Sequence, residues 1–143
     1  MNVIDWLEQV KKLDELINAK IAERNQVWTM ITSMTVKPQD DMPHAKGGIS
    51  DPVGNGVVKL QMLSEEIDKL VDQYVDHKRQ VIAMLEKLSP NEYGALHRHY
   101  IQHMTWENVA EDMGKSIMQI FRYRKKGLKN LTNAIECYTA HSV

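Results

Sequence analysis

The fold is decided by residues 105–120, which read TWENVAEDMGKSIMQI. Thr105 and Ser116 each stand where a helix N-cap is expected, because a hydroxyl oxygen there accepts hydrogen bonds from backbone N–H groups of the first turn. Gly114, between them, suits the left-handed conformation in which many helices end. The stretch therefore predicts a short helix, a tight turn and a second helix.

The two predicted helices cover residues 106–113 and 117–131 or beyond, and their spacing is typical of a helix-turn-helix. Ala110 is small where the two helices would cross closely. The apolar wedge between them is expected to consist of Val109, Met113 and Ile120. In this motif the second helix enters the major groove of DNA, with its N-terminal residues at the base edges.

A third helix is predicted immediately upstream, over residues 90–102. Its start is marked by the sequence Ser89-Pro90-Asn91-Glu92, in which Ser is the N-cap, Pro the first helical residue and Glu the partner that completes a capping box. We therefore expect residues 89–143 to form a three-helix domain that contains the helix-turn-helix.

The first 88 residues predict two long helices. Apolar residues recur every three or four positions over residues 3–34, and again from Val53 or Val57 to Leu88. Residues 35–56, between them, hold three of the four prolines and four of the seven glycines, which indicates a loop.

Each long helix has a single apolar stripe, and such a stripe is stable only when it is buried against a partner. The simplest arrangement is a long, antiparallel, coiled-coil-like hairpin over residues 1–88. A lone hairpin still exposes apolar surface, so we expect it to pair with a second copy as a homodimer. The predicted fold class is therefore all-α, with the helical hairpin first and the helix-turn-helix domain second.

The composition is that of an ordinary globular protein and not of a membrane protein or a disulfide-rich one. Eighteen Lys+Arg residues against nineteen Asp+Glu residues give a net charge of -1, and 43% of the chain is hydrophobic, as in ordinary globular domains. Cys137 is the single cysteine, which excludes an internal disulfide and favours a reducing compartment. No apolar run approaches the ~20 residues that cross a bilayer. We therefore expect a cytoplasmic protein with no membrane partner.

The charge is unevenly distributed along the chain. Residues 115–131 carry six cations and no acid, whereas a solvated helix face normally mixes both signs. This stretch predicts a surface for double-stranded DNA. Because Gln pairs with adenine and Arg with guanine in the major groove, the base contacts are assigned to Ser116, Met118, Gln119 and Arg122. The phosphate contacts are assigned to Lys115, Lys125, Lys126 and Lys129.

Two patterns resemble known families. Residues 105–131 follow Thr-Trp-Glu-x-Val-Ala-x-x-Met-Gly and Ser-x-x-x-Ile-x-Arg-x-x-x-x-Gly-Leu-x-x-Leu, and so resemble the last DNA-binding region of bacterial sigma factors, which recognises the −35 promoter element. With WLEQVKKLDELINAK at 6–20 and DKLVDQYVDHKR at 68–79, nearly the whole chain resembles small phage and prophage proteins of low-GC Gram-positive bacteria. These are RinA/ArpU-type, sigma-like regulators of late genes.

Three positions depart from that family pattern. Asn108 stands in place of the usual Glu, and His103 in place of an expected turn Gly. Gly127 stands in place of the usual Ala. Because Gly inside a helix costs about 0.5–1 kcal/mol relative to Ala, we expect the second helix to fray at Gly127.

The sequence predicts neither a metal site nor an enzymatic activity. His99 and His103 have the i, i+4 spacing that can share zinc, but the predicted helix ends near residue 102, and no Cys or acid stands at a zinc-like spacing. We assign no metal, and expect these residues and His97 to be surface histidines. The chain has no phosphate-binding glycine loop, no nucleophile elbow and no paired catalytic carboxylates. No enzyme activity and no cofactor are therefore expected.

The expected function is a phage-encoded, sequence-specific transcription regulator, whose hairpin serves for oligomerisation or for docking on RNA polymerase. A DNA-packaging protein similar to a small terminase subunit would combine the same motif with a ring of many copies. A structural coiled-coil protein without DNA binding is the third alternative. Oligomeric state and DNA retardation distinguish the three.

Overall fold

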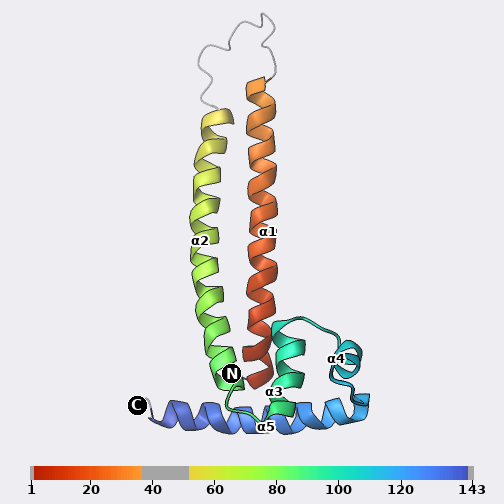
Figure 1. Cartoon of the computed structure of the whole chain (residues 1–143). Helices are drawn as coiled ribbons and strands as arrows, with labels where there is room; N and C mark the ends of the chain where they lie inside the picture. The colour runs from red at the N-terminus through yellow and green to blue at the C-terminus, as the bar shows by residue number, and fades with distance from the viewer. Residues whose placement is uncertain (1, 37–51, 142–143) are drawn as a thin grey trace, which may run out of the picture. The chain divides into compact units, whose positions relative to one another are not determined.

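The computed structural model describes residues 2–36 and 52–141, and every regular element in this part of the chain is a helix. The predicted all-α class is therefore confirmed (Figure 1). The elements in chain order are α1 (Val3–Val36), α2 (Pro52–Leu85), α3 (Pro90–Leu96), the π-helix η1 (His97–Ile101), α4 (Trp106–Met113) and α5 (Ile117–His141).

The described chain divides into two compact units. The first unit takes its residues from the ranges Met1–Asp14 and Gln73–Val143, and the second from Glu15–Asp72. Both long helices therefore contribute to both units, because the beginning of α1 and the end of α2 pack with the C-terminal helices. The predicted segment 1–88 thus supplies residues to each unit.

The second unit consists of segments of α1 and α2 that lie side by side (Figure 1). Val27 and Ile31 of α1 form a small buried cluster with Leu63 of α2. Two ion pairs flank the helix contact: Lys20 Nζ lies 3.1 Å from Glu66 Oε2, and Lys59 Nζ lies 3.8 Å from Glu23 Oε1. Glu23 follows Lys20 along α1, whereas its partner Lys59 precedes Glu66 along α2. The two segments therefore run in opposite directions.

The ends of the two long helices differ from the predicted loop at 35–56. α1 continues to Val36 and α2 already begins at Pro52, so the edges of that predicted loop are helical. Pro suits the first helical turn because the N–H that it lacks would have no hydrogen-bond partner within the helix there. Gly56 is helical as well, and its missing side chain leaves room for Ile31, whose Cγ1 would lie 2.8 Å from a Cβ atom there. The rest of the predicted loop, 37–51, lies outside the described residues.

The α2 helix also ends earlier than predicted, at Leu85. A tighter turn follows, in which the backbone N–H of Lys87 donates to Met84 O and that of Leu88 donates to Leu85 O. These i→i+3 bonds satisfy two of the carbonyls that every helix C-terminus leaves open.

The first unit has two buried clusters. The larger one joins α1, α2, α3, η1 and α5 around fully buried leucines and valines, and its members include Leu7, Val10, Val81, Leu85, Leu96 and Leu131. The smaller one joins α3, α4 and α5, and consists of Ala95, Val109, Ala110 and Ile120. The C-terminal helices are therefore held both to one another and to the adjoining ends of α1 and α2.

The predicted single helix over 90–102 is two elements. After α3 the backbone widens into the π-helix η1, where the N–H of Gln102 donates to His97 O at 3.1 Å, an i→i+5 bond. His103 then takes a left-handed conformation, with φ 60°. A turn Gly was expected at this position from the sequence resemblance, and Gly is the residue that adopts this left-handed conformation most readily.

None of the helices in the described ranges is both long and apolar enough to pass through a lipid bilayer.

Candidate nucleic-acid interface

The region from α4 to α5 is built from local signals that match the prediction. The Thr105 hydroxyl accepts a hydrogen bond from the Asn108 N–H at 3.2 Å and so caps α4. α4 ends at Met113, and Gly114 follows in the left-handed conformation with φ 65°. α5 then begins at Ile117. The boundaries of α4, the turn and the start of α5 are those expected from the sequence.

Small and branched residues hold α4 against α5. Ile120 of α5 is fully buried against Val109 and Ala110 of α4 and Ala95 of α3. Met113 and Ile117 pack at the edge of this cluster. Burial of Ile120 fixes the rotation of α5, and so determines which of its residues lie on the outside.

The outer side of α5 is a cationic surface. It consists of Arg122, Lys125, Lys126 and Lys129, and all four side chains are exposed. Their spacing of three or four residues places them along one side of the helix. No salt bridge in the described ranges involves any of them. Lys115, in the turn before α5, is also exposed.

The predicted base-reading residues lie at the N-terminal end of this cationic surface. Met118 is 66% exposed, and Ser116, Gln119 and Arg122 are exposed as well. Phe121, in the same turn of α5, is 47% exposed. The structure thus brings all four predicted residues onto one accessible surface, together with an aromatic side chain.

Ser116 and Gln119 are joined by two reciprocal hydrogen bonds. The Ser116 N–H donates to Gln119 Oε1 and the Gln119 N–H donates to Ser116 Oγ, each at 3.2 Å. This is a capping box, with Gln in the place of Glu. Two of the four residues predicted to contact bases therefore also cap the start of α5.

Arg124 is the cation of this stretch that sequence reasoning left without a role. Its guanidinium lies 5.5 Å from the centre of the Trp106 ring, and its Nε is buried without a hydrogen-bond partner. A cation over an indole face is attracted by the ring's negative charge distribution. Arg124 therefore links α5 to the first residue of α4. The inward position of Arg124 could have been predicted from the helical period, because it falls on the same side of α5 as Ile117 and Leu131.

Two of the three histidines expected at the surface, His97 and His99, are partly buried, whereas His103 is exposed as expected. The His99 ring stacks on Trp106, with ring centres 3.8 Å apart, and the His97 ring stacks on Tyr93. His99 Nδ1 lies 2.7 Å from the carbonyl oxygen of Met104. A carbonyl only accepts, so Nδ1 carries the proton. Desolvation lowers the pKa of both rings, and nearby cations lower it further, Arg124 for His99 and Arg98 for His97.

No group of three or more His, Cys, Asp or Glu side chains in the described chain converges on a point where a metal ion would bind.

Gly127 does not interrupt α5, contrary to the expected fraying. The helix runs on to His141, and Gly127 is buried. A Cβ atom there would lie 2.9 Å from Leu96 Cδ1 and 3.3 Å from Glu92 Cβ. The missing side chain therefore lets α3 approach α5 closely. This contact offsets the conformational cost of Gly in a helix.

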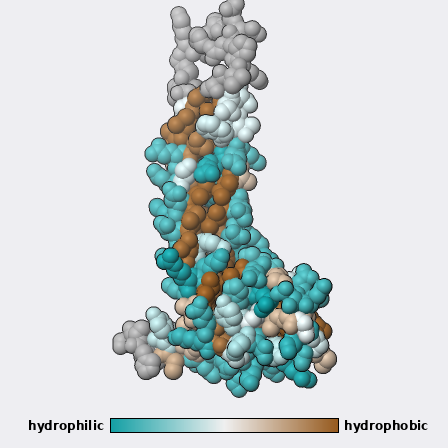
Figure 2. Space-filling view, viewed as in Figure 1, coloured by the Kyte–Doolittle hydropathy of each residue, from teal (hydrophilic) through white to brown (hydrophobic). Residues whose placement is uncertain are grey.

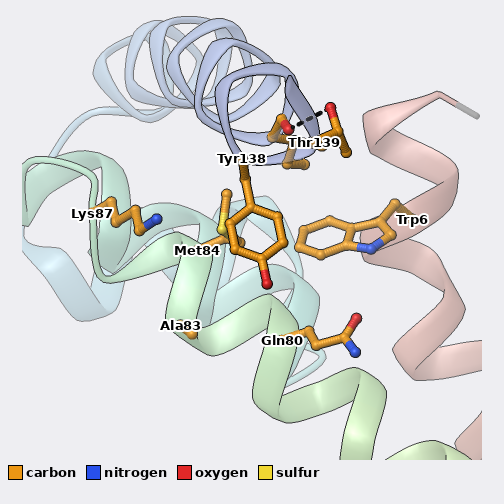
Figure 3. A pocket seen from close by; sticks show the side chains of 8 residues that line it. Trp6, Gln80, Ala83, Met84, Lys87, Tyr138 and Thr139 are labelled. Carbon is orange, nitrogen blue, oxygen red and sulfur yellow. Dashed lines mark hydrogen bonds between the residues drawn. The ribbon is translucent and has the colours of Figure 1, made fainter. Parts of the chain in front are cut away.

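A hollow of about 370 Å³ lies at the other end of α5 (Figure 3). The Tyr138 ring stands between the Met84 and Trp6 side chains, and Lys87 Nζ lies 5.8 Å from the centre of that ring. These residues come from the beginning of α1, the end of α2 and the turn after it, and the end of α5. The hollow is separate from the cationic surface, which lies nearer the beginning of α5.

The described residues thus define an all-α protein whose last helix exposes an unpaired cationic surface beside its capped N-terminus. A family model described as "Protein of unknown function (DUF722)" matches residues 10–133. The chain belongs to this family. The comparison with curated proteins and the comparison with solved structures each gave no match.

Proposed function

We propose that this protein is a sequence-specific DNA-binding transcription regulator in which α4, the turn at Gly114 and α5 act as a helix-turn-helix. The observation that carries the proposal is the exposed cationic surface of Arg122, Lys125, Lys126 and Lys129, which no acid of the described chain neutralises. Phosphates are the partners that such a row of cations fits.

The arrangement of α4 and α5 supports major-groove binding in particular. The buried cluster around Ile120 sets the rotation of α5, and its opposite side carries both the cations and the exposed Met118. In the proposed complex Ser116, Met118, Gln119 and Arg122 face base edges. The four lysines Lys115, Lys125, Lys126 and Lys129 contact the phosphates on either side.

The biological setting of the proposal rests on the sequence resemblance. A chain that resembles sigma-like, RinA/ArpU-type regulators fits a phage or prophage protein that acts on late genes in the cytoplasm of its bacterial host. Such a regulator acts at promoters, where RNA polymerase is the second partner.

The second unit supports a homodimer through the long helical hairpin. Its buried cluster is small, while several large apolar side chains on the same two helix segments are exposed: Leu16, Trp28, Met30, Val57, Val58, Met62 and Val71. Figure 2 shows hydrophobic residues running along this pair of helices. Apolar surface of this extent is typical of an interface, and a second copy would complete a four-helix bundle.

The proposal is tested by fluorescence anisotropy with the full chain and a duplex of random sequence. Binding is expected at 50 mM salt, a condition chosen to favour electrostatic contacts, and log affinity should fall by ~0.9 per phosphate contact for each unit of log salt. The double variant Lys125→Glu/Lys126→Glu should abolish binding. The matched control Lys12→Glu/Lys69→Glu changes the net charge equally, at exposed positions of α1 and α2, and should bind as the wild type does.

The other two functions are outcomes of the same experiments. A ring of many copies in light scattering would favour a DNA-packaging protein over a promoter regulator. Absence of binding by the wild type at 50 mM salt would overturn the proposal and leave a structural coiled-coil protein.

A further inference from the structure

Two large apolar side chains are exposed near the start of α5, among its cations. Met118 and Phe121 are three residues apart, so they are neighbours on the surface of the helix. The exposed cations Arg122 and Lys125 lie four residues further along from each of them. Phosphates fit the cations but offer no apolar group to Met118 and Phe121, which we call the apolar pair.

The ring of Phe121 is held in place by α4. Its centre lies 6.2 Å from the centre of the Trp106 ring, with 65° between the two planes, an edge-to-face arrangement that aromatic pairs favour. Trp106 is itself stacked on His99 and has the Arg124 guanidinium beside it. Phe121 is therefore exposed and yet supported from behind, so that little side-chain freedom is lost when a partner binds.

The major groove of DNA offers one kind of apolar group at its base edges. Guanine, adenine and cytosine display hydrogen-bond donors and acceptors there, whereas thymine displays its C5 methyl group beside the O4 acceptor. Apolar side chains, phenylalanine among them, contact this methyl group in protein–DNA complexes. The helical period places Met118 on the side of α5 opposite the buried Ile120, which is the side that enters the groove in the proposed complex.

We propose that Met118 and Phe121 together contact the C5 methyl group of a thymine in the bound duplex. Phe121 is then a specificity-determining residue in addition to the four that were predicted from the sequence. This inference rests on the proposed function, and it names a chemical group by which that function selects its site. Burial of one methyl group corresponds to about fourfold in affinity.

The experiment replaces thymine by uracil, which forms the same base pair and lacks only the methyl group. The full wild-type chain first selects a duplex from a random double-stranded library. That duplex is then synthesised again with one thymine at a time replaced by deoxyuridine, and each affinity is measured by fluorescence anisotropy. At one thymine the replacement should weaken wild-type binding by about fourfold.

Variants assign this difference to the apolar pair. Met118→Ala/Phe121→Ala should bind the thymine and uracil duplexes equally, and each single variant should show a smaller difference than the wild type does. The single variants give the same comparison where the double variant binds too weakly to measure. Both positions are exposed and alanine favours a helix, so α5 should stay formed, which circular dichroism checks.

Two control variants leave the apolar pair intact. Lys126→Ala removes a proposed phosphate contact, and should weaken binding to both duplexes while keeping their ratio at about fourfold. Tyr138→Ala removes an exposed aromatic ring at the other end of α5, and should leave both affinities unchanged.

The outcomes separate this inference from the function on which it rests. If the wild type selects a duplex without thymine, or binds it equally well after every replacement, the inference is wrong, although DNA binding stands. If the double variant and both single variants keep the full difference between thymine and uracil, other residues contact the methyl group and the inference is again wrong. If the wild type binds no duplex at all, the inference fails together with the proposed function.

Discussion

Asn130 Nδ2 of α5 donates a 3.0 Å hydrogen bond to Glu92 Oε1 of α3. The other carboxylate oxygen of Glu92 accepts the N–H of Ser89 at 3.2 Å, so one side chain both starts α3 and ties it to α5. Glu92 is only 3% exposed. A charge buried to this extent is tolerated only when its oxygens have partners.

Glutamate is usually a surface residue, but substitution of the buried Glu92 should destabilise the protein strongly. We expect Glu92→Ala to lower the free energy of unfolding by about 2–3 kcal/mol, because it removes two hydrogen bonds to a charged group. Glu92→Gln keeps the shape but leaves only one acceptor, and should lose about half as much. Urea denaturation measures both. The control Glu86→Ala, at an exposed position of the turn after α2, should stay within about 0.5 kcal/mol of the wild type.

Gly127 gives a second prediction, in which a better helix former lowers stability. Gly127→Ala gains about 0.5–1 kcal/mol of helix propensity. The new Cβ atom, however, would push the buried Leu96 and Glu92 of α3 away from α5, and overpacking of this kind costs about 1–3 kcal/mol. We expect a net loss of about 1 kcal/mol in urea denaturation. Asn133→Ala, on the exposed side of α5, is the control and should be neutral or slightly stabilising. A more stable Gly127→Ala would show that α3 and α5 can separate freely.

The sequence predicted those parts of the fold that depend on neighbouring residues. Thr105, Gly114 and Ser116 act within one turn of themselves, so the bounds of α4 and the start of α5 could be predicted without knowledge of the rest of the chain. The same holds for the exposure of Arg122 and Lys126, which follows from the helical period once α5 is placed.

The features that were missed depend on residues far apart in the chain. The role of Gly127 depends on where α3 lies, and the stacking of His99 depends on the left-handed turn at His103, which brings Trp106 beside it. The π-helix η1 has no local signal in the sequence either.

The cationic surface predicts two different effects of single substitutions on DNA binding. Arg122→Ala should weaken binding by about 1–3 kcal/mol, mostly at one base position, because an arginine fork recognises guanine. Lys126→Ala should weaken binding to all sequences alike and reduce the salt slope by about 1. Anisotropy titrations with the selected duplex and its single-base variants distinguish the two. If both variants bind every duplex as the wild type does, a different surface contacts DNA.

The stacked histidines predict a loss of stability in mild acid. The pKa of His97 and that of His99 are lowered in the folded state, mainly by desolvation, so both rings stay neutral there while the unfolded chain keeps the ordinary pKa of 6.5. As the pH falls through 6.5, the unfolded state takes up protons first, and the free energy of unfolding decreases. Stability should therefore be constant from pH 8 to about 7 and fall below about pH 6.5.

Thermal unfolding measured between pH 8 and pH 5 checks this pH dependence. His97→Gln and His99→Gln should each make it shallower, since each removes one group that titrates differently in the two states. Ring pKa values at or above 6.5 in an NMR titration of the folded protein would contradict the prediction.

The exposed apolar side chains of the second unit predict a dimer that charge can dissociate. Val57 and Val71 are two heptads apart, so they lie on the same side of α2, and Val57 is 49% exposed. We expect the wild type to have twice the 16.5 kDa mass of one chain in light scattering, and Val57→Asp/Val71→Asp to have the mass of one chain. Both positions are exposed in the single chain, so the variant should keep its helical circular dichroism. Lys69→Asp, on the outer side of α2, adds an acid without touching this apolar stripe and should remain dimeric. A wild type that has the mass of one chain at micromolar concentration would show that the hairpin does not pair with a second copy.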